Sequence, residues 1–181
     1  MTKYLLLSFL LMASIAPAQT LIPVEKGSSV KFAINNLGFN VDGTFMAISG
    51  SIQFDENNLA GCSFNVTVNA NTVNTNNSTR DKHLKGEDYF NVSVYPVIRI
   101  VSTKIAKSTT PGYFVFFGQL TIKGITGEIV FPFQAVEEEG AYRFTGEFKI
   151  KRRDFNIGGT NTISNELKVL LNILTKKIKF K

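Results

Sequence analysis

Hydrophobic and polar residues alternate along most of the chain. Val30, Phe32 and Ile34, for example, are separated by single residues that are more polar or smaller. This period of two is typical of a β-strand with one buried face and one wet face. The same alternation recurs near Phe45 and in residues 52–54, 64–70, 98–100, 114–122, 129–133, 142–150 and 169–173. Turn residues such as Pro111-Gly112 separate these segments, so the pattern predicts about eight strands.

Residues 76–90 are the stretch that lacks this alternation. They are rich in polar and charged residues, and Asn77 and Ser78 near the start are favourable helix N-caps. We therefore expect a short helix in a connection between strands. No linker, composition break or internal repeat divides the chain, so residues 19–181 are expected to form one domain.

Three glycines bear on how these strands hide their apolar faces. Antiparallel strands bury such faces either between two packed sheets or inside a closed barrel. Gly50, Gly118 and Gly146 lie on the apolar face of their segments, where a side chain would otherwise point inward. They suggest a lumen with space left in it, but glycines also let a sheet coil at a barrel corner. An eight-stranded barrel is either filled by side chains or able to hold one ligand, and the pattern leaves both open.

Residues 1–18 have the features of a secretory signal peptide. Lys3 precedes an apolar run over residues 4–15, and Ala-Pro-Ala at 16–18 provides a small-x-small cleavage site. The run is shorter than the roughly 20 apolar residues that a membrane-spanning helix needs. We therefore expect cleavage after Ala18 and a mature protein that is exported, either periplasmic or secreted.

The composition offers few residues for catalysis. Among 181 residues there are 16 Phe but only one Cys and one His, Cys62 and His83. A zinc site normally needs three or four His, Cys or carboxylate ligands, and the chain has no phosphate-binding glycine loop or nucleophile elbow. A single cysteine excludes an intrachain disulfide framework, and the apolar content excludes disorder. We therefore expect that the protein is not an enzyme and that it binds neither a metal nor a cofactor.

The chain is basic, with a formal net charge of +6. The basic residues form two modest clusters: Lys151, Arg152 and Arg153 after a predicted strand, and Lys176, Lys177, Lys179 and Lys181 at the C-terminus. Nucleic acid is not an expected partner of an exported protein. The clusters suggest either transient contact with an anionic membrane surface or a solvated edge that limits aggregation. Association of two copies as a homodimer stays open.

Short motifs follow one another in a fixed order after residue 29. They read Val30-Lys-Phe32-Ala-Ile34, Leu37-Gly38-Phe39, Gly43-Thr-Phe45, Gly50-Ser-Ile52-Gln-Phe54-Asp55, Arg80-Asp81-Lys-His83-Leu84, Tyr89-Phe90, Tyr95-Pro96, Leu120-Thr-Ile122-Lys-Gly124-Ile-Thr126 and Arg153-Asp154-Phe155-Asn-Ile157-Gly158. Together they resemble the YceI-like family of bacterial polyisoprenoid-binding proteins over nearly the whole mature chain. The chain departs from that family's pattern at Asn36, where His is frequent, and at Asn156, where Gly is usual.

The resemblance implies both a fold and a function. The fold is all-β, an eight-stranded antiparallel lipocalin-like barrel with one short helix in a connection. The protein would be exported and would hold a long-chain amphiphile in its lumen, such as a polyprenyl chain, an isoprenoid quinone or a fatty amide. This favours the hollow barrel over the filled one.

A lumen for such a chain should be walled by inward side chains, because burying apolar surface contributes roughly 25 cal/mol per Å². The residues expected at this site are Phe32, Ile34, Phe45, Ile52, Phe54, Val66, Ile100, Phe116, Gly118, Leu120, Ile122, Phe131, Gly146, Phe148, Ile150 and Leu171, with some of them packing the barrel floor instead. Arg80 and His83 are the candidates for a headgroup, by pairing with a phosphate or hydrogen-bonding a quinone or amide oxygen. Alternatively, Arg80 bonds Asp81 or loop carbonyls and fixes the helix.

The main functional hypothesis is therefore a non-enzymatic protein that carries or stores a long-chain lipid. Two other classes stay open. A lipid-modifying enzyme on the same barrel would need a set of polar residues at the mouth. A surface interaction module would have a solid interior.

Overall fold

A computed structural model of the chain describes residues 20–158 and 162–178. The expected signal peptide, residues 1–18, and Lys179 and Lys181 lie outside the described residues. The strands are β1 (Thr20–Pro23), β2 (Ser29–Asn36), β3 (Phe39–Gln53), β4 (Ser63–Asn74), β5 (Val97–Lys107), β6 (Tyr113–Ile122), β7 (Ile125–Glu138), β8 (Ala141–Lys151) and β9 (Ile163–Lys177). Between them lie the α-helix α1 (Ser78–Lys85) and the 3₁₀ helices η1 (Leu59–Gly61) and η2 (Arg152–Phe155). Within the described ranges, no helix has the length and apolar character to cross a membrane.

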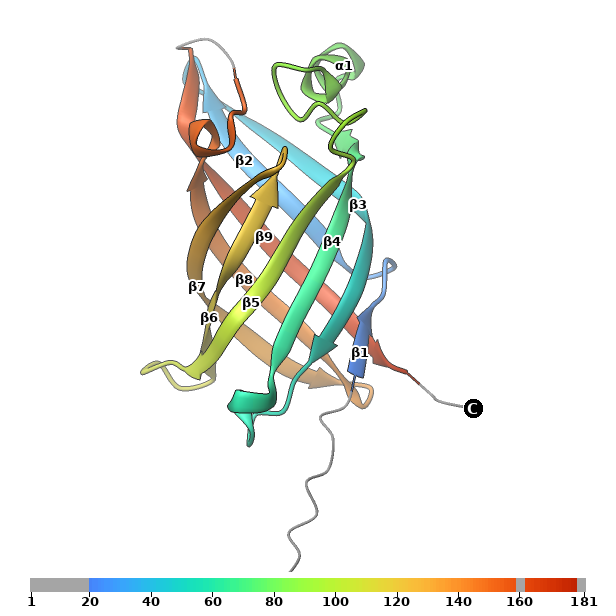
Figure 1. Ribbon diagram of the computed structural model, residues 1–181, viewed down its shortest axis with the longest axis vertical. Coiled ribbons are helices and arrows are strands. Elements are labelled where there is room, and N and C mark those ends of the chain that lie inside the picture. The colour runs from blue at the N-terminus through green and yellow to red at the C-terminus, as the bar shows by residue number, and fades with distance from the viewer. Residues whose placement is uncertain (1–19, 159–161, 179–181) are drawn as a thin grey trace, which may run out of the picture.

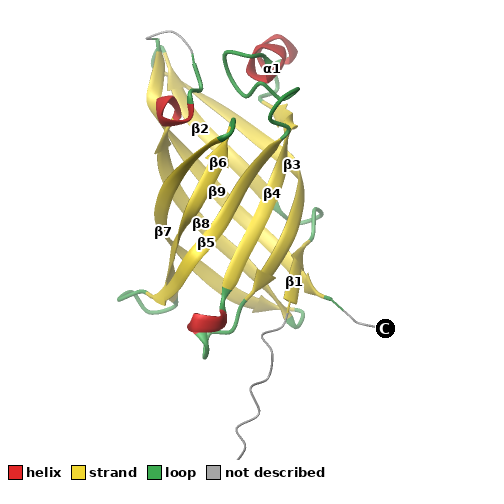
Figure 2. Ribbon diagram, in the orientation of Figure 1, coloured by secondary structure: helices red, strands yellow, loops and turns green. Residues whose placement is uncertain are grey.

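The strands form one closed antiparallel barrel in the order β1-β3-β2-β9-β8-β7-β6-β5-β4, with β4 pairing back to β3 (Figures 1 and 2). β1 and β2 share one position in it, because both lie between β3 and β9. β1 pairs there through Leu21 with Ile52, and β2 through Phe32 with Gly43. The predicted eight-stranded barrel with a short helix is thus confirmed. The pattern missed β1, whose four residues are too few to show a period.

The alternation predicted correctly which side chains point inward. In β6, Phe114, Phe116, Leu120 and Ile122 are buried, while the alternate residues Val115, Phe117, Gln119 and Thr121 are more exposed. The same parity buries Ile129, Phe131 and Phe133 in β7 and Phe144, Phe148 and Ile150 in β8. The core of the protein is therefore the interior of the barrel.

Interlocking aromatic rings fill one end of the barrel. This end carries η1 and is the lower one in Figure 1. The ring of Phe54 is the centre of this cluster. Its centroid lies 5.1 Å from those of Phe114 and Tyr142 and 5.3 Å from that of Phe144, each in an edge-to-face arrangement. Such geometry adds to the stabilisation from burial alone. Phe54, Phe114 and Phe144 are 4%, 8% and 5% exposed, so these packed rings close this end of the barrel.

The short helix predicted from the polar stretch is α1, and it lies at the opposite, upper end of the barrel (Figure 1). Asn77 is its N-cap, and its side-chain oxygen accepts a hydrogen bond from the Arg80 backbone N at 3.0 Å. The Asp81 carboxylate accepts two more, from the backbone N and the hydroxyl of Thr75 at 2.8 and 2.6 Å. These bonds fix the helix to the end of β4, although none of its residues is buried.

The inward glycines do not all leave open space, which corrects one reason for expecting a hollow barrel. A Cβ at Gly118 would overlap the backbone carbonyl of Val101 and the ring of Phe116, so this glycine admits a neighbouring strand and ring. Gly50 has a φ of +128°, and a Cβ there would meet the backbone of β4. At Gly146 a Cβ would lie 3.1 Å from the ring of Phe131. The space inside the barrel therefore does not come from the missing side chains of these three glycines.

Candidate ligand-binding site

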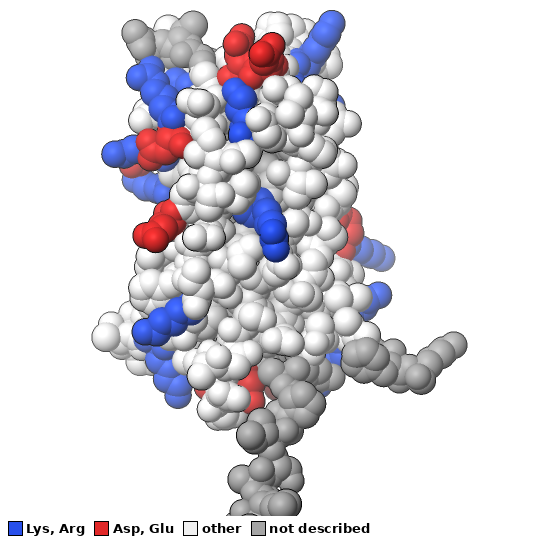
Figure 3. Space-filling model, viewed as in Figure 1, with Lys and Arg blue, Asp and Glu red and all other residues white. Residues whose placement is uncertain are grey.

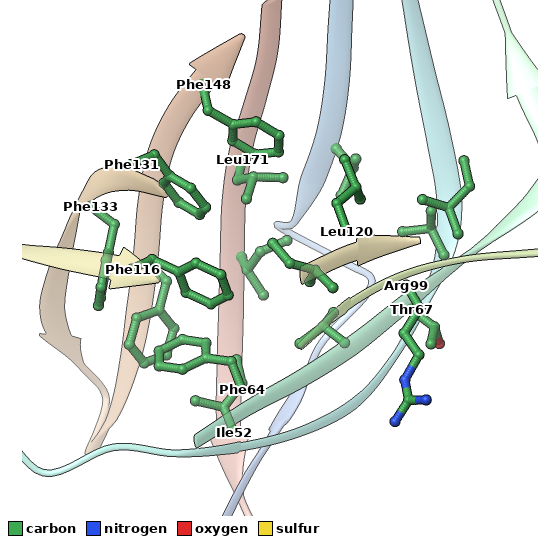
Figure 4. Close-up of a pocket in the computed structure, with 18 of the residues that line it drawn as sticks. Ile52, Phe64, Thr67, Arg99, Phe116, Leu120, Phe131, Phe133, Phe148 and Leu171 are labelled. Atoms are coloured by element: carbon green, nitrogen blue, oxygen red, sulfur yellow. The ribbon is translucent and has the colours of Figure 1, made fainter. Parts of the chain in front are cut away.

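The barrel encloses two adjoining apolar cavities. The larger, which we call the mouth chamber, has a volume of about 500 Å³ and lies below α1. The smaller, the inner chamber, has about 100 Å³ and lies toward the aromatic cluster. Five residues line both cavities and mark the junction: Val30, Val68, Ile98, Leu120 and Phe148. Figure 4 shows the inner chamber, where Phe64, Phe116, Phe131 and Leu171 face one another and Arg99 extends away from them.

The mouth chamber is lined by strands around the barrel, and the parts of its wall differ in burial. Inward residues of β2 and β9, such as Phe32, Ile34 and Val169, are only partly buried, and all of them line this chamber. Inward residues of β6 and β7, such as Phe116 and Phe131, are fully buried. The space therefore lies where the inward side chains of β2 and β9 are incompletely covered.

Sixteen of the predicted site residues line the chambers, and two do not. The mouth chamber is lined by Phe32, Ile34, Phe45, Arg80, His83, Ile122 and Ile150, the inner chamber by Ile52, Val66, Ile100, Phe116, Phe131, Gly146 and Leu171, and both by Leu120 and Phe148. Phe54 lies in the aromatic cluster, and Gly118 is covered by the Phe116 ring. Neither of these two residues is in contact with a chamber.

The polar residues of the mouth chamber gather at the α1 end. They are Asn36, Asn77, Thr79, Arg80, His83, Tyr89 and Arg152, and the described lining holds no Asp or Glu. Arg80 is half-buried, and its Nε and Nη2 donate to the hydroxyl and carbonyl oxygens of Thr75, both at 2.7 Å. Arg80 therefore bonds a carbonyl of the connection before the helix, and these contacts hold α1 against residue 75. His83 is exposed at the rim.

Arg152 is a buried residue of this end that sequence reasoning placed on the surface. The residue is 2% exposed, and its guanidinium donates to the carbonyl oxygens of Ile157 and Ser164 at 2.9 Å and of Ile163 at 3.1 Å, and also to that of Gly158. Burial lowers the pKa of Arg152, because a charged group loses solvation there. The basic cluster at 151–153 is therefore divided, with only Lys151 and Arg153 exposed.

Other lining residues were also missed by sequence reasoning. Val68, Ile98 and Val169 share the inward parity of residues that were named, so the alternation itself could have found them. Tyr89 and Ile157 come from connections at the upper end, where no period exists to guide a prediction.

The two most reactive side chains lie at opposite ends of the barrel. Cys62 follows η1 at the lower end, and His83 belongs to α1 at the upper end. Burial raises the pKa of the Cys62 thiol, whose sulfur accepts a hydrogen bond from the Asp55 N at 3.3 Å. No group of three or more His, Cys, Asp or Glu side chains that could hold a metal occurs in the described part of the chain.

The remaining basic residues do not form a single charged face. Lys176 and Lys177 end β9 at the lower end, opposite the mouth chamber. On the face in Figure 3, positive and negative side chains are interspersed along the barrel. Part of this mixing is ion pairing, such as Lys149 with Glu166 at 2.7 Å and Lys168 with Glu147 at 2.6 Å.

The sequence of the chain matches the family model of the YceI-like domain over residues 23–174, which extend from β1 to β9. The chain belongs to the YceI-like family. A UPF0312 protein of Photorhabdus laumondii is 37% identical to this YceI-like chain over 70% of its length and 69% of the relative's. A UPF0312 protein of Yersinia enterocolitica is 35% identical over 80% and 78%.

Solved structures have the same fold as this YceI-like barrel. The Campylobacter jejuni YceI protein superposes with a TM-score of 0.67 at 29% identity, over 78% of this chain and 87% of that one. Burkholderia cenocepacia BcnA gives a TM-score of 0.79 at 22% identity, over 83% and 98%. A polyisoprenoid-binding domain from Saccharophagus degradans gives 0.70 at 15% identity, over 89% and 99%. The latter two identities are low enough that these likenesses concern the fold.

Proposed function

We propose that this YceI-like protein is a non-enzymatic carrier or store of one long-chain amphiphilic lipid, held in the barrel lumen. The observation that carries the proposal is the mouth chamber, about 500 Å³ of apolar space with its polar residues at one end. Ligand pockets typically have volumes of about 300–1,000 Å³ and few, well-placed polar groups. An amphiphile matches this distribution, with its chain in the lumen and its headgroup at α1.

The family supports the choice of a lipid ligand. Its Saccharophagus degradans structural neighbour is described as a polyisoprenoid-binding domain. Each buried CH₂ group contributes about 0.8 kcal/mol, so a flexible hydrocarbon gains most of its binding free energy from walls such as these. Polyprenyl, isoprenoid quinone and fatty amide chains all fit this description.

We place the headgroup beside Arg80 and His83. The described lining of the mouth chamber contains two arginines and no carboxylate, so the local charge favours a hydrogen-bond acceptor or an anion. Arg80 uses Nε and Nη2 on Thr75, which leaves Nη1 as a donor for a ligand. A phosphate, a quinone oxygen or an amide oxygen would each be recognised here.

We also propose that the mouth end contacts the membrane from which the lipid comes. Leu37, Phe39 and Val94 are the most exposed large hydrophobic side chains of the described residues, at 69%, 76% and 61%. The first two form the β2–β3 turn beside Asn36 and Val41 of the chamber wall. Insertion of these side chains into a bilayer would bring the mouth to the lipid. The Leu37→Ser, Phe39→Ser variant should then take up lipid from vesicles more slowly while binding lipid with unchanged affinity at equilibrium.

Native mass spectrometry of the protein expressed with its N-terminal segment tests the main proposal. A bound lipid should appear as a discrete mass above that of the polypeptide, and organic extraction should release it for identification. The same spectra report whether the N-terminus begins at Gln19, as export with cleavage requires, and whether two copies associate. A protein that carries no lipid and takes up neither polyprenyl nor quinone ligands would overturn the proposal.

A further inference from the structure

The lumen has a closed lower end, which sets a limit on what fits inside. Phe64, Phe133 and Phe144 line the inner chamber and also pack against Phe54 behind them, with ring centroids 6.3, 6.2 and 5.3 Å from that of Phe54. We call these three residues the aromatic floor. A ligand chain that enters from the mouth ends at this floor.

The rings of the aromatic floor are tightly packed against one another. The Phe64 centroid lies 5.2 Å from that of Phe144 and 5.6 Å from that of Phe133, so each ring of the floor is held by the others as well as by Phe54. Beside it, Phe116, Phe131 and Phe148 form a stacked column with centroid separations of 4.8 and 4.7 Å. Displacing one ring requires its neighbours to move, because protein interiors are close-packed.

The two chamber volumes convert into a chain length. An apolar cavity of about 150 Å³ in another protein holds benzene, which corresponds to roughly 25 Å³ per carbon. On that scale the mouth chamber, at about 500 Å³, takes about 20 carbons. The inner chamber, at about 100 Å³, takes about four more.

We propose that the aromatic floor makes the lumen a gauge of chain length, selecting amphiphiles with about 20–24 apolar carbons, or four to five isoprene units. The proposal rests on the proposed function, because it assumes that a lipid chain occupies the lumen. A longer chain can fill the lumen only with its tail end, and its remaining carbons and its headgroup then stay outside the mouth, away from Arg80. Length beyond the floor therefore adds nothing to affinity.

A series of isoprenoid alcohols with two to eight isoprene units tests this, by displacement of a fluorescent fatty acid from the delipidated protein. Affinity should rise steeply up to about four or five units and then stay within about twofold. A continued rise to eight units, or a plateau already at two, would overturn the gauge while leaving lipid binding intact. If no alcohol of any length binds, the proposed function itself fails.

Variants at the floor make the test specific. Phe64→Ala opens about one benzene-sized space and should move the plateau about one isoprene unit upward. Leu171→Phe adds a ring to the inner chamber and should move it about one unit downward, so the proposal stays testable if the first variant fails to fold. Phe155→Ala is the matched control, since Phe155 is a buried ring at 4% exposure that lines neither chamber. A plateau that stays in place in the folded variants would refute the role of the floor.

Discussion

Replacement of the buried Arg152 gives the most direct test of how the upper end of the barrel is built. The guanidinium donates to the carbonyl oxygens of Ile157 and Gly158 after η2 and of Ile163 and Ser164 at the start of β9. It therefore joins the two sides of one connection through a single planar group. Methionine at this position would fill similar volume, but it would leave all four of these bonds unmade.

The expected loss of stability in Arg152→Met follows from those four carbonyl acceptors. Hydrogen bonds to a charged donor contribute roughly 1.5–3 kcal/mol each, and they are not additive, so the loss of all four should cost about 3–5 kcal/mol in total. For a domain of this size each kcal/mol lowers the Tm by about 2–4 °C, so Arg152→Met should lose roughly 10 °C.

Thermal and urea unfolding followed by circular dichroism would measure this loss. Arg152→Lys should lie between the wild type and Arg152→Met, because an ammonium group has three donors and lacks the planar fork. Lys151→Met is the matched control, as Lys151 is exposed at the neighbouring position. A Tm of Arg152→Met within about 2 °C of the wild type would show that the carbonyl contacts do not stabilise this end.

Three further predictions concern other parts of the barrel. Gly118→Ala should destabilise the protein by about 1–3 kcal/mol in urea unfolding, because the added Cβ would overlap a backbone carbonyl. The Cβ of Gly146→Ala would contact side chains that can shift, so this variant should lose less stability than Gly118→Ala. Equal losses of stability would contradict this reasoning. Arg80→Met should weaken binding of a lipid with an anionic headgroup about tenfold relative to the alcohol of the same chain, measured by displacement; an equal loss for both ligands would assign Arg80 a structural role alone. Arg143 donates to Glu138 at 2.6 Å and holds the pKa of that carboxyl below its usual value. The stabilisation of the folded protein by this pair is therefore present above the pKa that Glu138 has in the unfolded chain, and it is lost as the pH falls through the pKa of Glu138 in the folded protein. The stability difference between wild type and Glu138→Gln should therefore vanish in acid, and a difference that persists at pH 2 would contradict the assignment.

Much of the barrel could be predicted because its signal is local. A strand places alternate side chains on opposite faces, so Phe116, Leu120 and Phe148 could be assigned to the interior before any strand pairing was known. The same holds for the N-cap Asn77, whose effect depends on the next three residues. The strand that was missed, β1, completes the barrel by pairing with residues far away in sequence, at Ile52 and Lys177.

The candidate site depended on the tertiary structure to a greater extent. The alternation along a strand shows that a residue faces the interior. Whether its side chain contacts another ring or borders empty space depends on the tilt and register of the strands. Phe54 and Phe32 share that parity, yet one is the centre of a filled cluster and the other lines the mouth chamber. For the same reason Gly118 looked like a gap in the sequence and is covered by a ring in the structure.

The sequence by itself therefore determined the succession of β-strands and the set of inward side chains, because both follow from the geometry of the backbone over a few residues. Closure into a barrel was implied by the resemblance to the YceI-like family, and it rests on long-range pairings such as that of β4 with β3. The tertiary structure decided the position of the chambers, the floor that ends them and the burial of Arg152. Arg152 differs from its neighbours Lys151 and Arg153 only in where the folded chain brings four carbonyl oxygens together. That convergence depends on residues before and after a connection, which no local pattern specifies.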